Sequence, residues 1–320
     1  SSDGQALAQR PGQDEVLAAV EKVAPTVHGI SQKLWDLSEV SLLEVESSAY
    51  LKDLLKKNGF TITSEGTAGV PTAFIAEYGE GDPKLGIMLE YDALPGLGNE
   101  AIPKKQPRTD GVTAGHGCGH NLIGAGSMGA ALAIKDLMQA KQLPGTLRIY
   151  GGAAEESEGA KVFMARDGVF DDLDAMLHWH PMDVGHVCNL RTAAAQHMYI
   201  EFKGKAAHAG LYPWKGRSAL DAVEILLHAV NNMREHVEPT ARIQYIIKEG
   251  GTATNVVPEK ASVMLTYRDV DRKHVNDGVA WIKDMVKGAG LCTQTDGLAV
   301  AYFGLHDLLP NTPLARRMQK

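Results

Sequence analysis

The first half of the chain alternates between helical and strand-like patterns of apolar residues. From Val16 to Val40 the apolar residues recur at helical spacing, and Pro25 is expected to divide this stretch into two helices. Strand-length apolar runs then alternate with further helices. The predicted strands cover residues 60–63, 72–78, 85–91, 146–154 and 175–179, and the predicted helices cover 46–57, 122–139 and 161–166. This alternation predicts an α/β fold with a mostly parallel sheet flanked by helices.

The second half of the chain has longer alternating strands and fewer helices. Its predicted strands cover residues 187–203, 241–248, 261–269 and 293–303, and its predicted helices cover 218–236 and 275–287. A run of strands with two helices on one side is typical of a small α+β unit. We therefore expect a first domain over residues 1–191, returning incompletely at 303–320, and an inserted α+β domain over 192–302.

Composition narrows the classes of protein that fit. The chain has 320 residues, three cysteines and a formal net charge of −7. This charge argues against a nucleic-acid partner, which needs a basic surface. No apolar run approaches the ~18 residues of a membrane span, and an odd cysteine count argues against a disulfide framework. We expect a soluble protein that is either cytoplasmic or, because residues 6–9 suit the remnant of a cleaved signal peptide, exported to the periplasm.

Candidate chemistry is densest between Thr113 and Gly129. Within it, Cys118 lies two residues from His116 and two from His120, with glycines between them, at a predicted loop-to-helix junction. Glycine permits the sharp turns that let such side chains converge. The same stretch contains G-x-G-x-x-G at residues 124–129. A dinucleotide fingerprint should directly follow a strand and open a helix, whereas this one lies inside the predicted helix, so the dinucleotide interpretation is disfavoured.

Further candidate ligands follow successive strands. The four groups are Asp92, then Cys118 with His120, then Glu155 with Glu156, and then His178 with His180. The carboxyl ends of strands in an open α/β sheet are where ligands bind. Thiolate, imidazole and carboxylate together suit a borderline divalent metal such as Zn²⁺, with Mn²⁺, Co²⁺ or Ni²⁺ as other candidates. Of two adjacent glutamates, one can bind metal while the other takes a proton from water.

Each of these residues has a structural interpretation when it is taken singly. Asp92 suits a turn cap, Cys118 a small core residue, and the Glu155-Glu156 pair a solvated helix start. Their common position at strand ends favours a shared site instead. A second chemical interpretation makes Cys118 a nucleophile, with His120 as its base. That interpretation leaves the glutamate pair without a role and is disfavoured.

Taken together, the motifs resemble those of the aminoacylase/carboxypeptidase family of metal-dependent amidohydrolases. The chain is most similar to the p-aminobenzoyl-glutamate hydrolase-like branch of that family. The resemblance rests on H-G-C-G-H-N (116–121), E-Y-D-A-L-P-G (90–96), A-E-E (154–156), W-H-P (179–181) and G-K-A-A-H-A (204–209). It implies a hydrolase that uses two divalent metal ions, Zn or Mn above Co or Ni. The implied reaction cleaves the amide bond of N-acyl amino acids or dipeptide-like substrates with a free carboxylate.

The resemblance also implies a role for each matching residue of the first domain. Cys118, His120, Glu156 and His180 match metal ligands, with His178 as the alternative to His180. Glu155 matches the general base that deprotonates a metal-activated water. Asp92 matches an aspartate that orients a ligand histidine.

The second domain resembles the family's lid and dimerisation domain. His208 then matches a histidine that reaches into the site of a partner subunit and stabilises the oxyanion, so a homodimer is implied. Asn255 and Arg268 match residues that hold the substrate near its carboxylate, and a guanidinium suits that task because it can bind a carboxylate with two parallel hydrogen bonds. Without the resemblance, these three would be a surface histidine, a turn asparagine and a strand-edge arginine.

One departure from the family's pattern concerns the end of the chain. Members of the family continue past the position of Lys320 and supply a last metal-ligating histidine there, whereas here no histidine follows His306. We therefore expect one metal site to be incomplete within these 320 residues. The competing functional hypothesis is a non-catalytic metal- or ligand-binding module that keeps the motifs but lacks this ligand.

Overall fold

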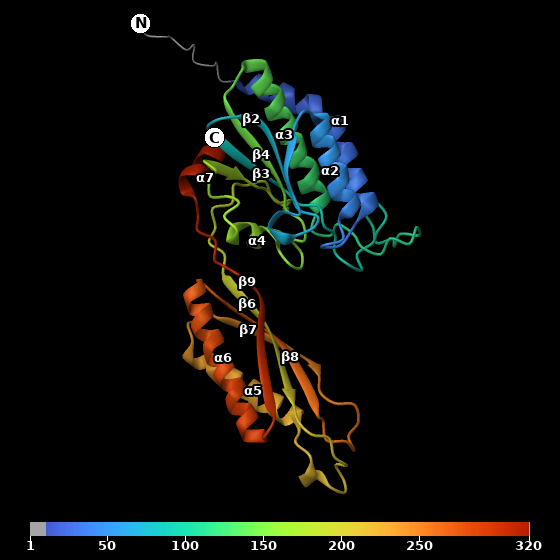
Figure 1. Ribbon diagram of the computed structural model, residues 1–320, viewed down its shortest axis with the longest axis vertical. Coiled ribbons are helices and arrows are strands. Elements are labelled where there is room, and N and C mark those ends of the chain that lie inside the picture. The colour runs from blue at the N-terminus through green and yellow to red at the C-terminus, as the bar shows by residue number, and fades with distance from the viewer. Residues whose placement is uncertain (1–10, 320) are drawn as a thin grey trace. The chain divides into compact units, whose positions relative to one another are not determined.

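The chain folds into two units. The computed structural model describes residues 11–319, and the chain divides into two compact units between Val184 and Gly185 (Figure 1). The proposed signal-peptide remnant at residues 6–9 lies outside the described residues. The domain boundaries drawn from the sequence stay a prediction.

The first unit is built on a mixed five-stranded sheet. The strands are β1 (Thr61–Glu65), β2 (Phe74–Glu80), β3 (Lys84–Leu89), β4 (Gly145–Gly151) and β5 (Ala175–Leu177). Their order in the sheet is β1-β2-β4-β3-β5. β3 runs parallel to both β4 and β5, whereas β2 is antiparallel to β1 and β4. The predicted fold class is confirmed, and the parallel strands are the ones that carry the candidate ligands.

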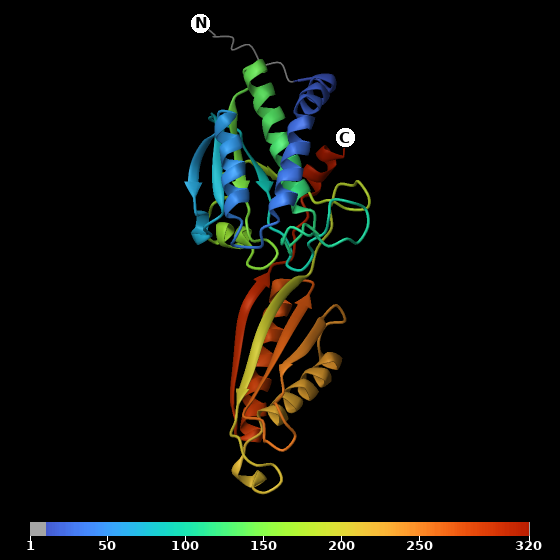
Figure 2. The same cartoon turned by 90° about the vertical axis from the view of Figure 1, so that its right-hand side faces the viewer.

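Helices flank this sheet. They are α1 (Gln13–Leu37), α2 (Val45–Lys57), α3 (His120–Lys141) and α4 (Ala160–Arg166). The prediction that Pro25 divides two helices was wrong, because α1 continues through it. A proline inside a helix removes one hydrogen bond at a cost of about 3 kcal/mol. The packing of α1 along α3 (Figure 2) offsets that cost. Along this contact α1 buries Val23 before the proline and Ile30 and Leu34 after it.

The close contact between α1 and α3 depends on Gly129. A Cβ atom at this position would lie 2.4 Å from Cγ2 of Val27 on α1, and a β-branched side chain in a helix has little rotamer freedom with which to move away. We expect Gly129→Ala to lower the free energy of unfolding of this unit, because overpacking of about 1–3 kcal/mol exceeds the ~1 kcal/mol gained in helix propensity. Urea unfolding followed by circular dichroism measures the change.

The matched control for this substitution is Gly29→Ala in α1. A Cβ atom there meets nothing within 4 Å. The Gly29→Ala substitution should therefore stabilise the unit by up to ~1 kcal/mol through helix propensity alone. If both alanine variants were stabilising, the tight packing of α3 on α1 would be disproved.

The second unit is a four-stranded antiparallel sheet with two helices on one face. Its strands are β6 (Ala194–Lys203), β7 (Arg242–Glu249), β8 (Lys260–Asp269) and β9 (Asp296–Leu305), in the order β7-β8-β6-β9. Its helices are α5 (Ala219–Met233) and α6 (Arg272–Thr293), and a short helix α7 (Thr312–Met318) follows β9. Alternate residues of β6 and β8 pack against α5 and α6, which confirms the predicted α+β character.

One strand of this unit is shorter than the sequence predicts. The apolar pattern predicts a strand from residue 187, but β6 begins at Ala194. There it pairs with Asp269, the last residue of β8. Upstream of Ala194, β6 therefore has no neighbouring β8 residue with which to continue the ladder, and the backbone leaves the sheet.

No helix within residues 11–319 combines the length and the apolar character that crossing a bilayer requires.

Candidate metal centre

The candidate ligands of the first unit follow the three parallel strands. β3 ends at Leu89, just before Glu90 and Asp92. β4 leads to the Glu155-Glu156 pair, and β5 ends just before His178 and His180. Because parallel strands end at the same edge of the sheet, these side chains gather in one place. His120, the first residue of α3, lies among them.

The loop before α3 turns sharply so that two neighbouring side chains face the same centre. Gly119 has a φ of 83°, in the left-handed region that favours glycine. A Cβ atom at this residue would also lie 2.7 Å from Cγ of Pro181, which follows His180. Any other residue here would push the His180 loop away from Cys118. The glycine therefore lets the histidine and cysteine loops meet.

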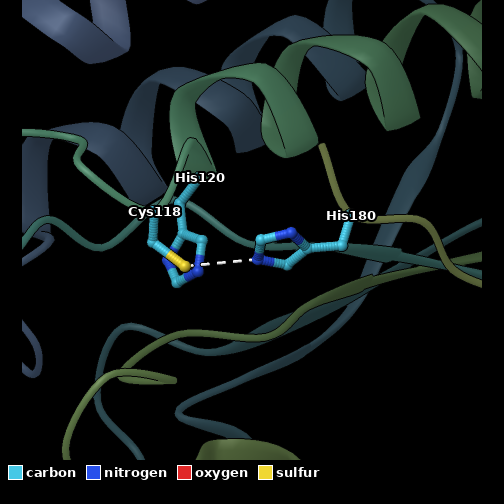
Figure 3. A group of neighbouring side chains, drawn as sticks. All are labelled: Cys118, His120 and His180. Atoms are coloured by element: carbon cyan, nitrogen blue, oxygen red, sulfur yellow. Dashed lines mark hydrogen bonds between the residues drawn. The ribbon is translucent and has the colours of Figure 1, made fainter. Parts of the chain in front are cut away.

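Two overlapping groups of donor atoms can each hold a metal ion. One consists of Cys118, His120 and His180, shown in Figure 3, and the other of His120, Glu155 and Glu156; within each group the donor atoms lie within 4.8 Å of one another. Sγ of Cys118 is 3.2 Å from Nε2 of His180. Nε2 of His120 is 3.6 Å from Oε2 of Glu155 and 3.8 Å from Oε1 of Glu156. The thiol and the Glu156 carboxylate, 38 residues apart in sequence, thus approach the same imidazole.

Asp92 fixes the orientation of this shared imidazole. Its Oδ1 is 2.8 Å from Nδ1 of His120, so Nε2 faces the other ligands. Oδ2 of the same carboxylate accepts hydrogen bonds from the Glu156 amide at 2.9 Å and from Oγ of Ser41 at 2.8 Å. Burial by itself raises the pKa of Asp92, but the bonds from His120 and Glu156 outweigh it and leave the pKa below its ordinary value. Asp92 is therefore an anionic support for both candidate groups.

The charges and unpaired atoms of this centre fit a cation. Nε2 of His120 and Oε1 of Glu156 are buried and have no hydrogen-bond partner among the described residues. Burial raises the pKa of the Cys118 thiol to about 12, assisted by the carboxylates of Glu156, Glu155 and Glu90. Burial also raises the pKa of Glu156. A divalent cation would compensate this concentration of negative charge, and sulfur, nitrogen and oxygen donors together suit Zn²⁺ and similar ions.

Glu90 was not among the predicted site residues. This residue is 1% exposed, pairs with Lys161, and has Oε1 3.2 Å from Nε2 of His178 and Oε2 3.4 Å from Nε2 of His120. Burial raises its pKa, but the His178 hydrogen bond and the Lys161 charge outweigh this and lower the pKa to about 2. The available signal was its position at the carboxyl end of the predicted strand 85–91, two residues before Asp92.

The two histidines after β5 have different partners. His178 pairs with Glu90, whereas His180 lies beside Cys118. The alternation of side chains along an extended segment explains why they diverge. Among the two alternatives, the geometry therefore supports His180 as the ligand.

A second buried carboxylate, Glu44, was also missed. It is fully buried, accepts a hydrogen bond from the Ala154 amide at 2.7 Å, and accepts another from Oγ1 of Thr72 at 2.7 Å. It thereby holds the backbone just before Glu155, at a residue whose φ is 52°. No local pattern in the sequence indicated this contact, because Glu44 reads as an ordinary acidic residue before a helix.

His116, counted with Cys118 and His120 as a potential ligand, lies outside both donor groups. Its Nε2 lies 3.0 Å from the carbonyl oxygen of Leu34 on α1. Burial lowers its pKa to about 4. The ring therefore packs as a neutral side chain between the loop and α1 rather than facing the metal centre.

The three candidate residues of the second unit do not form one cluster. His208 and Asn255 lie in neighbouring loops, since the amide of Ala209 donates to the carbonyl of Asn255 at 2.9 Å. Arg268 lies near the far end of β8, where it donates to Oε1 of Gln244 at 2.9 Å. At the rise of a β-strand, the eight residue steps from Lys260 to Arg268 span roughly 25 Å. Within one unit, Arg268 and Asn255 therefore cannot hold the same small substrate.

Known proteins resemble the chain in sequence and in fold. Residues 193–291 match the family model of the M20 peptidase dimerisation domain. One of the subunits of p-aminobenzoyl-glutamate hydrolase from Escherichia coli is 38% identical over 304 residues, which are 94% of this chain and 62% of that protein. The chain thus spans less than two thirds of the length of this relative.

Solved structures agree on the fold. A putative aminohydrolase from methicillin-resistant Staphylococcus aureus superposes with a TM-score of 0.77 at 17% identity, covering 96% of this chain and 79% of that one. A dinuclear metal-binding peptidase of the M20 family from Bacillus subtilis superposes with a TM-score of 0.65 at 20% identity, covering 94% and 81%. The family resemblance drawn from the motifs is therefore confirmed: residues 193–291 match the dimerisation domain of the M20 peptidases, and the chain is a sequence relative of p-aminobenzoyl-glutamate hydrolase.

Proposed function

We propose that the chain is a metal-dependent hydrolase of N-acyl amino acids or dipeptide-like substrates that carry a free carboxylate. The observation that carries the proposal is the meeting of Cys118, His120, His180 and the Glu155-Glu156 pair at one edge of the sheet. The similarity to a protein named as part of a p-aminobenzoyl-glutamate hydrolase supports an amide bond as the target.

Four side chains would hold the metal ions: Cys118, His120, Glu156 and His180. We propose a pair of divalent ions, Zn²⁺ or Mn²⁺ above Co²⁺ or Ni²⁺, which agrees with the solved relative described as a dinuclear metal-binding peptidase. Such ions polarise a carbonyl group and make a water molecule more acidic. Asp92 contributes by keeping the His120 ring in its binding orientation.

Glu155 would serve as the general base. It is half-buried beside the proposed ligand Glu156, and its Oε2 faces Nε2 of His120. A carboxylate in this position can take a proton from the attacking water and later give it to the leaving amine. The hydrogen bond that the Glu156 amide donates to the Asp92 carboxylate holds this dipeptide in place.

A second copy of the chain would supply His208. Nδ1 of this exposed ring accepts from the amides of Gly210 and Leu211, both at 3.2 Å. With Nδ1 as the acceptor, Nε2 of a neutral ring carries the proton and can donate to an oxyanion. His208 and Asn255 share one end of the second unit, and Arg268 lies far from them along β8. This separation agrees with a homodimer in which His208 and Asn255 serve one site and Arg268 serves another.

The proposal is tested by hydrolysis of a panel of N-acyl amino acids and dipeptides in the presence of Zn²⁺ or Mn²⁺. We expect release of free amino acid that stops when a chelator removes the metal and resumes when metal is restored. Activity that survives chelation but is abolished by alkylation of Cys118 would instead favour the cysteine nucleophile. Bound metal without hydrolysis of any panel member would favour the non-catalytic module.

A further inference from the structure

The first unit contains a large cavity that the proposed mechanism does not use. It has a volume of about 720 Å³ and lies between the end of α1 and the loop that joins β3 to α3. Ligand pockets of proteins commonly enclose about 300–1,000 Å³. The cavity is thus large enough for an aromatic group together with its attached chain.

Hydrogen bonds hold the wall of this cavity in place. The side chain of Arg108, which is 9% exposed, donates through Nη1 to the carbonyl of Trp35 at 2.7 Å and through Nη2 to that of Asp36 at 3.0 Å. The amide of Gly98 donates to the carbonyl of Thr113 at 2.8 Å across the loop. The loop is therefore tied both to α1 and to itself, which makes the cavity a built feature of the unit.

The cavity is lined by apolar side chains and by basic ones. Trp35, Leu97 and Val112 contribute apolar surface, and Lys104 and Lys105 contribute ammonium groups. Neither lysine forms an ion pair within the described part of the chain, and no aspartate or glutamate lines the cavity there. A group that carries positive charge would meet these two ammonium groups, since the neighbouring carboxylate of Asp110 is already paired with Arg108 of the lining.

The cavity adjoins the metal-binding loop. Gly117, the residue before Cys118, forms part of its wall. A Cβ atom at Gly117 would lie 2.6 Å from Cδ1 of Leu97, so the side chain of Leu97 packs directly on the backbone of the loop that carries Cys118. The wall of the cavity therefore includes the residue that directly precedes the proposed ligand Cys118.

We propose that the cavity receives the acyl group of the substrate and selects acyl groups that are apolar, aromatic or anionic over those that carry an ammonium group. The chain then prefers N-acyl amino acids to dipeptides, because a dipeptide would bring its free α-ammonium group toward two lysines. This inference rests on the proposed hydrolase function. Like charges 4 Å apart repel by about 1 kcal/mol in water, which corresponds to roughly fivefold in rate or affinity per lysine.

Two matched substrates test the preference with the metal-loaded chain. N-(3-phenylpropanoyl)-glutamate and phenylalanyl-glutamate differ only in the α-ammonium group. We expect kcat/KM to be at least about tenfold higher for the first, the combined effect of two repelling charges. Equal values for the two substrates, or faster hydrolysis of the dipeptide, would overturn the proposal.

Reversing the charge of the two lysines tests whether the cavity causes the substrate preference. The double variant K104E/K105E should reduce the ratio of the two kcat/KM values at least about fivefold, since it exchanges repulsion of the ammonium group for attraction. The control is K56E/K57E on α2, which changes the same net charge at two exposed lysines away from the cavity and should leave the ratio unchanged. A ratio that responds equally to both double variants would assign the effect to overall charge and contradict a cavity role.

A binding measurement that needs no hydrolysis tests the cavity assignment independently of the proposed hydrolase function. Titration with 3-phenylpropanoate should change tryptophan fluorescence, and the change should disappear in Trp35→Phe, because Trp35 lines the cavity. The cation 2-phenylethylammonium should bind at least about tenfold more weakly. If this binding is found but neither substrate is hydrolysed, the cavity assignment stands and the hydrolase proposal fails. If Trp35 does not respond to the anion, the cavity assignment fails whatever the activity.

Discussion

Replacing Glu155 with alanine is expected to lower kcat by about 10²–10⁴-fold, the usual contribution of a positioned general base. The metal content of the chain should stay the same, because the proposed ligands Cys118, His120, Glu156 and His180 all remain. Turnover and metal content should change independently, because Glu155 is the proposed proton carrier and the neighbouring Glu156 is the proposed metal ligand. Steady-state kinetics on an N-acyl amino acid, combined with metal analysis by mass spectrometry, measures both quantities.

The matched control for this variant is Glu158→Ala in the same acidic segment. The Glu158 side chain bonds to Ser157 rather than facing the His120 imidazole, so its loss should change kcat by less than about twofold, a small effect for a residue outside the proton path. Full turnover in the Glu155 variant would remove this residue from the proposed mechanism. Loss of metal from that variant would make Glu155 a ligand instead of a base.

Replacing His120 with alanine is expected to weaken metal binding more than any other single substitution in the centre. His120 is the residue that the two candidate donor groups share, so its loss removes one ligand from each. Cys118 and Glu156 belong to one group apiece, and their alanine variants should weaken one group alone. Isothermal titration with Zn²⁺ measures affinity and stoichiometry for each variant.

Asp92 provides a graded comparison for this series. Loss of a residue that orients a metal-binding histidine typically costs about 10–100-fold in metal affinity, so Asp92→Ala should lie between His120→Ala and the unaltered chain. The control is His186→Ala, which removes an exposed histidine outside both groups and should leave affinity unchanged. If His120→Ala bound Zn²⁺ as tightly as the control, the shared-ligand geometry would be disproved.

The sequence by itself predicted the fold class and the location of the candidate site. Hydrophobic periodicity is a local property, so the helices and the parallel strands could be recognised from spacing alone. The position of the candidate ligands after successive strands also predicted that they would lie close together, because parallel strands bring their carboxyl ends to one edge of the sheet. Asp92, the Glu155-Glu156 pair and His180 therefore meet in the structure as a consequence of topology that the chain order already implied.

The tertiary structure decided which side chains face the centre and which support it. Glu90 and Glu44 became visible only through burial and contacts to residues far along the chain, and His116 looked like a ligand until the structure showed its ring against α1. Pro25 was misread for the same reason, since only the packing of α1 on α3 shows how its cost is offset.

The physical reason is the range of the interactions involved. Periodicity and turn chemistry act over a few residues and can be read from neighbours in the sequence. Side-chain direction, burial of charge and the length of a strand such as β6 depend on partners brought together by folding, such as Asp269 opposite Ala194. The sequence determined where the chemistry gathers, and the packed structure decided which residues can carry it out.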